Sequence, residues 1–374
     1  ITPDGKYIYV SHNLGRFTVP TSQLQQGWMN TSAFSVIDVD KQEFLGAIVV
    51  DEPERGAAGI WSIACNDESV FISHSGTHEV SVIDHKAMLE KFLNYPNKAV
   101  LDYDLTFLYG LRERIPLEGN GPRNMILNGD KLIIPTYFAD ILNIMDINTN
   151  EVTSVELNPG REETAENKGE RYFNDASHCF QNWQSCNGCH PGDARTDGMN
   201  WDLMNDGVGN SKNCKSMLFS HMTPPNMISG IREHAERAVR AGFNFIQFFE
   251  VSEEDAACVD AYLKSLRPVP SPYLVNGELS DLAKEGQKVF EKLKCGECHS
   301  GVYYTDMKYH RIGEDIEFEK GWDTPTLREV WRTAPYLFDG RAATMKEVFS
   351  VHKHGIEKKV SEKDIEALTE YVNS

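Results

Sequence analysis

The sequence has no long apolar run and is poor in basic residues, and each absence excludes a class of protein. No uninterrupted apolar stretch reaches roughly 18 residues, so a membrane-spanning helix is not expected. Lys and Arg number 37 against 56 Asp and Glu, which gives a net charge of −19. A duplex-binding protein needs a basic surface, so no nucleic-acid partner is expected, whereas a basic redox partner protein would suit this charge.

The beginning of the sequence also lacks a start methionine and an apolar signal segment. It opens with Ile1 and the turn-forming residues Thr2-Pro-Asp-Gly5, so we expect a processed or cut chain. Its 374 residues suit two or three domains, and 40% hydrophobic with 25% charged residues is ordinary globular composition. The compartment therefore has to be inferred from side-chain chemistry.

Four of the eight cysteines form two identical patterns. These are Cys186-Asn-Gly-Cys189-His190 and Cys295-Gly-Glu-Cys298-His299. A histidine directly after a C-x-x-C pair is the attachment signature of c-type haem, in which two thiols bind the porphyrin and the histidine binds the iron. A single four-cysteine zinc site is the alternative, but its pairs usually lie about 15–20 residues apart. More than 100 residues separate the pairs here, which favours haem.

We therefore predict two covalently bound haems of type c, with His190 and His299 as iron ligands. Assembly of such haems implies an oxidising compartment, so we expect an exported, periplasmic or cell-surface protein. Two of Cys179, Cys214 and Cys258 are then candidates for a disulfide, whose pairing the sequence leaves open.

The second haem pattern opens a copy of the first. A shift of 109 residues also aligns the pairs Thr196/Thr305, Asp197/Asp306, Leu218/Leu327, Arg232/Arg341 and Tyr262/Tyr371. Ser252-x-x-Asp255 and Ser361-x-x-Asp364 resemble capping boxes and predict helices over about 253–266 and 362–373. This set in one register indicates two tandem, mainly helical cytochrome c-like domains.

The first 157 residues are rich in short β-type runs. Three segments share a plan in which the second run ends in an aspartate before a turn, as at Asp38, Asp84 and Asp146. They resemble the blades of YVTN-type β-propellers. About three blades are present, fewer than the usual four to eight, so the ring is completed either upstream of Ile1 or by another chain. An irregular β-sandwich is the alternative. The predicted strands are 6–11, 34–39, 44–50, 69–73, 80–83, 131–136 and 141–145.

These observations predict a multidomain chain with an all-β, propeller-like part and two mainly α cytochrome c-like domains. The expected parts are a partial propeller over 1–157, a charged linker over 158–172, a first haem domain over 173–270 and a second over 271–374. The Pro-rich segment 267–273 lies at the junction of the two haem domains.

The second axial position of each iron decides between electron transfer and chemistry. Residues 344–354 predict a short helix that brings His352 to the second haem. Helical residues turn by roughly 100° each, so His352 and His354 lie about 200° apart and only one faces the haem. We take His352 as the ligand. Its counterpart in the first half is Phe243, which cannot ligate, so the first iron has an open face. Rival ligands are His310 for the second haem and His221 or Met222 for the first.

At this point the chain resembles the bacterial dihaem cytochrome c peroxidases and their relative MauG over residues 173–374. The matching segments are Tyr304-Thr-Asp306, Thr324-Pro-Thr-Leu-Arg-Glu-Val330, Ala334-Pro-Tyr336, Asp339-Gly-Arg341 and Thr344-Met-Lys-Glu347. The family has methionine or tyrosine at the position of His352, so this resemblance implies bis-histidine ligation here. It also implies a catalytic glutamate at Glu250, and a calcium ion held by Asn213 and the carbonyls of Thr333 and Pro335.

The sequence departs from this family in two places. The Phe-Trp-Asp-Gly-Arg segment, whose Trp lies between the haems, has no counterpart near 226–232, which leaves Trp183 and Trp201 as weak candidates for an interhaem route. A histidine common in the loop after the first haem is absent around 206–209, as in members whose first haem is open without prior reduction.

The leading hypothesis is an exported dihaem oxidoreductase. Electrons from a redox partner protein would enter at the second haem and reduce peroxide at the first, where Glu250 would move the proton. Alternatives are a MauG-like oxidase of a protein or small nitrogenous substrate, or a dihaem subunit of a complex such as hydrazine synthase. A pure electron-transfer cytochrome with a propeller docking module, or a homo-oligomer, also stays open.

Overall fold

The computed structural model describes residues 1–374 except 19–26, 28, 204–210, 313–318 and 357. The chain divides into two compact units, each formed by two stretches of sequence. The first unit contains residues 1–188 and 242–259, and the second contains 189–241 and 260–374. The domain boundaries at 157, 172 and 270 stay predictions.

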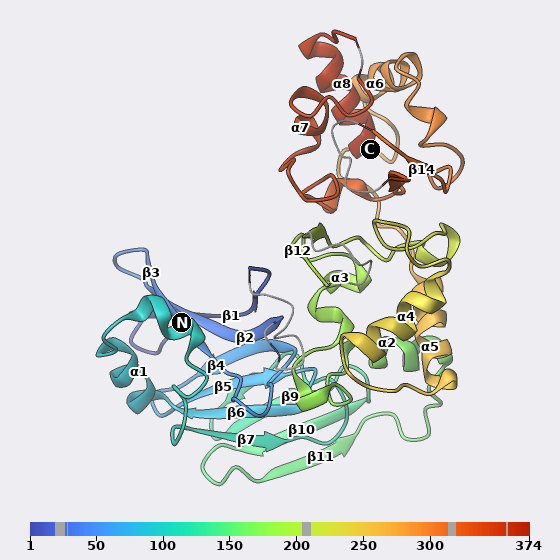
Figure 1. Cartoon of the computed structure of the whole chain (residues 1–374). Helices are drawn as coiled ribbons and strands as arrows, with labels where there is room; N and C mark the ends of the chain where they lie inside the picture. The colour runs from blue at the N-terminus through green and yellow to red at the C-terminus, as the bar shows by residue number, and fades with distance from the viewer. Residues whose placement is uncertain (19–26, 28, 204–210, 313–318, 357) are drawn as a thin grey trace. The chain divides into compact units, whose positions relative to one another are not determined.

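Three antiparallel sheets make up most of the first unit (Figure 1). Their strand orders are β1-β2-β3, β4-β5-β6-β7 and β11-β10-β9-β8. Within the described residues they form a propeller-like arrangement that is not closed into a ring. The strands are β1 Tyr7–Gly15, β2 Asn30–Asp38, β3 Glu43–Val49, β4 Ile60–Cys65, β5 Ser69–His74, β6 Glu79–Asp84, β7 Arg112–Pro116, β8 Ile126–Asn128, β9 Lys131–Pro135, β10 Ile141–Asp146 and β11 Val152–Glu156.

All seven predicted strands are present, and the repeated aspartate ends a strand each time. Asp38, Asp84 and Asp146 close β2, β6 and β10, and each carboxylate accepts a backbone N–H of the turn that follows. Asp84 thereby caps α1 (His85–Leu93). The aspartate therefore sets where each strand pair turns.

The four missed strands, β4, β7, β8 and β11, are partly exposed along most of their length. In contrast, β5 buries Val70, Phe71 and Ile72 completely. The core of the first two sheets continues through Met88 and Phe92 of α1. Exposed edge strands such as β7 and β11 carry a weak sequence signal, because only one side packs on the core. The strand β4 is apolar, and its short run was not predicted.

The helices of the haem-motif region are α2 Ala165–Asn174, α3 Pro191–Ala194, α4 Ala235–Phe245, α5 Glu253–Ser265, α6 Asp281–Lys292, α7 Met345–Ser350 and α8 Glu362–Asn373. Helix α2, capped by Thr164, lies largely within the segment predicted as an unpatterned linker. The helices predicted to follow Ser252 and Ser361 are present, and both hydroxyls accept an N–H from the residue three positions on. Thr344 opens α7 with a full capping box.

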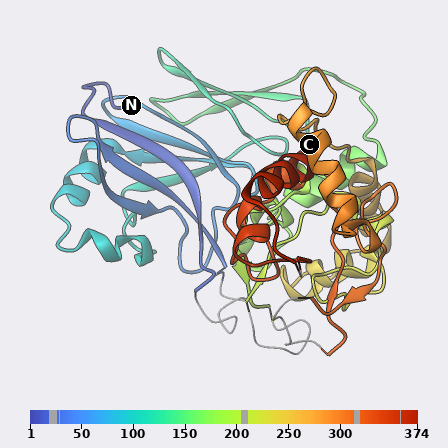
Figure 2. The same cartoon turned by 90° about the horizontal axis from the view of Figure 1, so that it is seen from above.

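Helices α6 and α8 cross at close range in the second unit (Figures 1 and 2, orange and red). A Cβ on Gly286 would lie 1.9 Å from the carbonyl oxygen of Ala367, so only glycine allows this approach. Phe290 of α6 and Leu368 of α8 enter a core shared with Met345 and Phe349 of α7. This core supports the segment that carries the second haem motif.

The internal repeat is present in the structure, although its register changes along the chain. The shift is 109 residues at the haem motifs, as the 3₁₀ turns Cys186–Gly188 and Cys295–Glu297 show. It becomes 110 at the turns Ser220–Met222 and Val330–Arg332. The predicted pairing of Arg232 with Arg341 is therefore wrong by one position, since the bridge Asn226↔Arg232 corresponds to Tyr336↔Ala342.

Candidate haem-binding sites

Both motif histidines are held in the orientation that an iron ligand needs. The Nδ1–H of His190 donates to the carbonyl oxygen of Arg195 at 3.1 Å, and that of His299 donates to Tyr304 at 3.1 Å. A carbonyl oxygen can only accept, so the proton must be on Nδ1, and Nε2 carries the lone pair that can bind a metal. Burial lowers the pKa of both histidines, which favours the neutral ring that binds metal.

A second imidazole faces His299, and it belongs to His354. The two ring centroids are 6.3 Å apart, with 49° between the ring planes. An imidazole nitrogen binds a transition metal at about 2 Å, so two ligating rings on opposite sides of one ion have their centres about 6 Å apart. Burial, with a contribution from His299, lowers the pKa of His354 to about 4. The pair has the spacing of two axial ligands of one iron.

The structure does not bring His352 to His299. Helix α7 ends at Ser350, and the ring of His352 is partly exposed with no hydrogen bond to a described residue. The prediction assumed that the helix continues to His354, whereas Lys353 has a φ of 51° that ends any helical course. Nε2 of His310 pairs with Asp306 at 2.8 Å, and His310 lies near enough to His299 to contribute to the lowered pKa of that histidine.

The first half has no histidine at the place of His354. The same two backbone hydrogen bonds occur after both helices. The N–H of Phe249 donates to the carbonyl oxygen of Phe243, and the N–H of His354 donates to that of Val348. Likewise, Gln247 donates to Gly242, and His352 donates to Glu347. Between these pairs, Phe248 and Lys353 both have φ above 50°. The equivalent of His354 is therefore Phe249, and the predicted pairing of Phe243 with His352 is wrong.

The unequal length of two helices causes this change of register. Helix α4 has 11 residues and α7 has 6, so the shift after them falls from 110 to 105 residues. A phenyl ring cannot bind iron, so the absence of this ligand from the first half stays a prediction, now with Phe249 in place of Phe243.

Side chains around Cys186 form a cluster within the first unit. Gln247 is 2% exposed, its Nε2 lies 3.8 Å from the sulfur of Cys186, and its buried Oε1 has no hydrogen-bond partner among the described residues. His178 is stacked between Tyr172 at 4.9 Å and Phe249 at 5.1 Å, measured between ring centroids. Sequence analysis did not predict this cluster, because its members come together only in the fold.

Glu250, the predicted catalytic acid, directly follows Phe249 and is exposed. Its carboxylate makes no hydrogen bond or ion pair with a described residue, so its catalytic role stays a prediction.

In the second unit, His190 lies beside a free thiol. The sulfur of Cys214 is 3.6 Å from Nδ1 of His190, and burial raises the pKa of this thiol.

All eight cysteines are free, so the disulfide expected among Cys179, Cys214 and Cys258 is not formed. No group of three or more His, Cys, Asp or Glu side chains suited to a metal ion is present in the described part of the chain.

The other candidate ligands of the first iron and the two tryptophans considered for an interhaem route either pair with other side chains or are exposed. His221 pairs with Asp260 at 3.0 Å, while Met222 is 42% exposed. The indole N–H of Trp201 donates to Asp197, and that of Trp183 donates to Gln181. The loop around 206–209, where a histidine is absent, lies outside the described residues.

Two of the three predicted calcium ligands are neighbours. A Cβ on Gly340 would lie 3.0 Å from a ring carbon of Pro335 and 3.1 Å from Nδ2 of Asn213. The side-chain oxygen of Asn200 and the carbonyl oxygen of Ala334 are near the same residues. Oxygen donors of this kind suit calcium. The carbonyl of Thr333 follows a 3₁₀ turn just before this segment.

A buried ion pair joins the two haem-motif segments inside the second unit. Arg195, whose carbonyl accepts from His190, places its guanidinium 2.9 Å from the carboxylate of Glu329, and the side chains are 4% and 1% exposed. Glu329 also accepts from Arg332 at 3.0 Å. It lies one residue from Val330, which packs in the core behind the second motif. Sequence reasoning gave neither residue a role.

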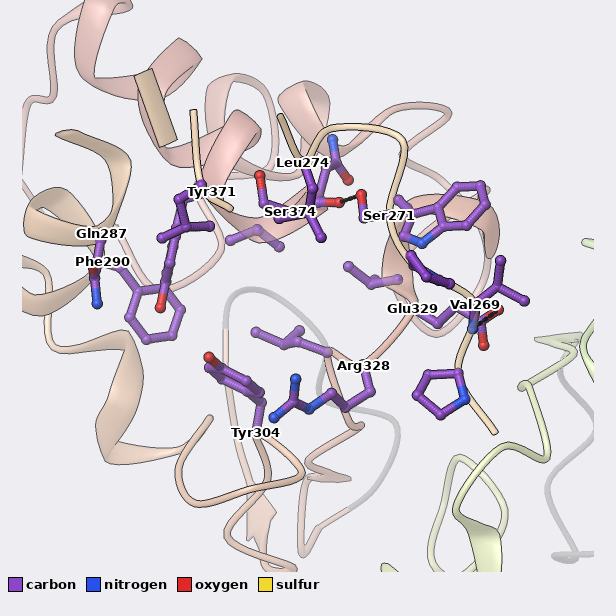
Figure 3. Close-up of a pocket in the computed structure, with 18 residues that line it drawn as sticks. Val269, Ser271, Leu274, Gln287, Phe290, Tyr304, Arg328, Glu329, Tyr371 and Ser374 are labelled. Atoms are coloured by element: carbon purple, nitrogen blue, oxygen red, sulfur yellow. Dashed lines mark hydrogen bonds between the residues drawn. The ribbon is translucent and has the colours of Figure 1, made fainter. Parts of the chain in front are cut away.

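Glu329 also borders a cavity of about 500 Å³ in the second unit (Figure 3). Tyr304, Tyr371 and Phe290 lie together on one side of it, and Val269 lies beside Glu329 on the other. The cavity touches the segment behind His299, because Tyr304 supplies the carbonyl that accepts from this histidine. The histidines and attachment cysteines do not line it.

No helix in the described ranges is long and apolar enough to cross a membrane.

Comparisons with known proteins agree with this architecture. No protein-family model matches the chain. The hydrazine synthase subunit gamma of Kuenenia stuttgartiensis is 27% identical over 271 residues, covering 55% of this chain and 76% of that protein. A solved structure of Kuenenia stuttgartiensis hydrazine synthase has a TM-score of 0.51 at 23% identity, covering 58% of this chain and 88% of that one. A MauG-like protein associated with microbial copper homeostasis has a TM-score of 0.45 at 18% identity, covering 59% and 90%. The chain is thus similar in sequence to a hydrazine synthase subunit over 55% of its length, and similar in fold to a hydrazine synthase chain over 58%.

Proposed function

We propose that the chain is an exported dihaem oxidoreductase with two unequal irons. The observation that carries the proposal is the difference between the two halves: His354 faces His299 in the second, whereas Phe249 stands at the equivalent place in the first. A second strong ligand makes an iron an electron carrier, and an open position allows it to bind a substrate.

The residues that would hold the two haems follow from the motifs. Cys186, Cys189 and His190 would hold the first haem, and Cys295, Cys298, His299 and His354 would hold the second.

A haem with an open iron position supplies the binding and two-electron reduction of a hydroperoxide. The net reaction is H₂O₂ + 2 e⁻ + 2 H⁺ → 2 H₂O, with electrons from a redox partner protein. Glu250 is the proton-transfer residue suggested by the family resemblance. Asn213 and the carbonyls of Thr333 and Pro335 would hold calcium between the two motif segments.

The sequence similarity to hydrazine synthase subunit gamma favours a second candidate. In this candidate the chain is one subunit of a complex, and its open iron acts on a small nitrogen compound rather than peroxide. The unclosed sheets of the first unit would then offer strand edges to another chain.

The test is reduction of the two-haem protein followed by mixing with hydrogen peroxide or with hydroxylamine in a stopped-flow spectrometer. We expect peroxide to reoxidise both haems rapidly, with two electrons consumed per peroxide. Reoxidation by hydroxylamine but not by peroxide would overturn the peroxidase candidate in favour of the second one. No reaction with either compound would contradict both and leave a pure electron-transfer cytochrome.

A further inference from the structure

Two side-chain contacts inside the second unit join each haem-motif loop to the other half of the repeat. Glu329 of the second half pairs with Arg195, in the loop after the first motif. Phe219 of the first half packs on Tyr303, in the loop after the second motif, with 5.0 Å between the ring centroids. All four residues belong to one compact unit. The two halves therefore support each other's motif loops.

Glu329 and Phe219 occupy the same place in the two halves. Each directly precedes a 3₁₀ turn, Val330–Arg332 and Ser220–Met222 respectively, and each has a φ of 61°. This left-handed backbone is uncommon outside glycine and persists only where the surrounding structure holds it. The side chains at this place differ in chemistry, so the loop of the first motif receives a charged contact and that of the second an aromatic one.

The charged contact fixes the residue that orients His190. The carbonyl oxygen of Arg195 accepts the Nδ1–H of His190 at 3.1 Å. The guanidinium of Arg195 places both Nε and Nη2 2.9 Å from Oε2 of Glu329. Its other donors bind the carbonyl oxygens of Arg267 and Asp193. Both side chains of the pair are buried, so water cannot replace the carboxylate. The place of the supporting carbonyl therefore depends on Glu329.

We propose that Glu329 is a positioning residue for the first haem, which acts through Arg195 on the iron ligand His190. This inference rests on the proposed function. A hydrogen bond from Nδ1–H to a fixed acceptor orients a metal-binding imidazole and raises its basicity. A ligand that donates more electron density favours cleavage of an O–O bond. The carboxylate of one half thus tunes the iron of the other half.

Resonance Raman spectroscopy of the reduced protein measures this effect without turnover. A five-coordinate ferrous haem gives an iron–histidine stretching band, whose frequency falls when the hydrogen bond from Nδ1–H weakens. A haem with two histidine ligands gives no such band, so the signal reports the first haem alone. We expect Glu329→Gln to move the band to lower frequency, because Arg195 loses its carboxylate. Reoxidation by peroxide should slow by about 10–100-fold, the range for loss of an outer hydrogen-bond partner of a metal ligand.

A second variant keeps the test independent of folding, since loss of one partner of a buried ion pair is destabilising. Arg195→Met combined with Glu329→Gln removes both charges, which a buried pair tolerates better than removal of one. We expect the double variant to shift the band in the same direction. Arg332→Gln is the matched control, because it removes the other partner of Glu329 and leaves the contact with Arg195. Its band should stay at the wild-type frequency.

Three results would contradict the proposal. A wild-type band in both Glu329 variants would overturn the positioning role and leave the proposed function intact. An equal shift in Arg332→Gln would show an effect of charge rather than of the contact with Arg195, and would overturn the role as well. A reduced wild-type protein without an iron–histidine band would overturn the proposed function and this inference with it.

Discussion

At the scale of single residues, the proposed second haem site depends on which of two nearby histidines turns inward. His352 and His354 differ by two positions, and the left-handed backbone at Lys353 separates them. The ring of His354 lies 6.3 Å from that of His299 between centroids, while His352 is not in contact with it. Which histidine faces His299 is therefore decided by how the chain leaves the helix, not by helical periodicity.

Replacing His354 by alanine should open the second iron. We expect His354→Ala to convert its low-spin ferric signal to high-spin, because a strong axial nitrogen ligand is lost. His352→Ala is the matched control and should leave the spectrum unchanged. Electron paramagnetic resonance measures both, and a change in the His352 variant alone would restore the ligand inferred from the sequence.

At the scale of elements, the length of one helix makes the two halves chemically different. Helix α4 is five residues longer than α7, with 11 residues against 6, so the segments after them carry different side chains to equivalent places. The backbone hydrogen bonds there are the same in both halves, and only the residue changes, from His354 to Phe249. This equivalence can be tested by exchange.

Phe249→His should close the first iron. The backbone at this position already has the course that presents His354, so we expect the variant to become low-spin at both haems and to lose peroxide or cyanide binding. His354→Phe is the reciprocal variant and should give two high-spin irons. Optical spectra of the oxidised protein report both changes, and a Phe249→His protein that keeps its high-spin iron would contradict the structural register.

The buried pair of Arg195 and Glu329 should stabilise the second unit. Glu329→Gln keeps the shape but leaves Arg195 and Arg332 without their shared carboxylate, and loss of one partner of a buried ion pair costs about 3–5 kcal/mol. Asp339→Asn is the control, because its pair with Arg341 is about one-third exposed and should contribute about 0–1 kcal/mol. Urea unfolding measures both free energies, and equal losses would refute a special role for Glu329.

The parts predicted from the sequence are those with short-range causes. The haem motifs, the strand-closing aspartates and the serine caps each depend on residues within a few positions of one another. The facing rings of His354 and His299 and the cluster of His178 and Phe249 could not be predicted, because they depend on helix length and on packing between distant segments. The strands β7, β8 and β11 were missed for a related reason, since exposed edges have no apolar alternation.

At the scale of the whole molecule, the net charge of −19 bears on the choice of electron donor. An excess of acidic over basic groups attracts cationic proteins and repels anionic ones over distances of the order of the Debye length, about 10 Å at 0.1 M salt. The charge therefore favours a basic redox partner protein.

Reduction of the oxidised protein by a small basic cytochrome should slow markedly as salt increases. We expect the second-order rate constant to fall between about 0.01 and 0.3 M salt, because screening removes the electrostatic attraction. An acidic flavodoxin as donor should show the opposite trend. A rate with the basic donor that is independent of salt would exclude electrostatic steering.

The spin state of the two irons tests the central claim most directly. Electron paramagnetic resonance of the oxidised protein, with haem content measured as the pyridine haemochrome, counts each kind of iron. We predict two haems per chain, with one high-spin and one low-spin ferric signal of equal intensity. Two low-spin signals would contradict the open first iron, and fewer than two haems per chain would contradict the account from its first step.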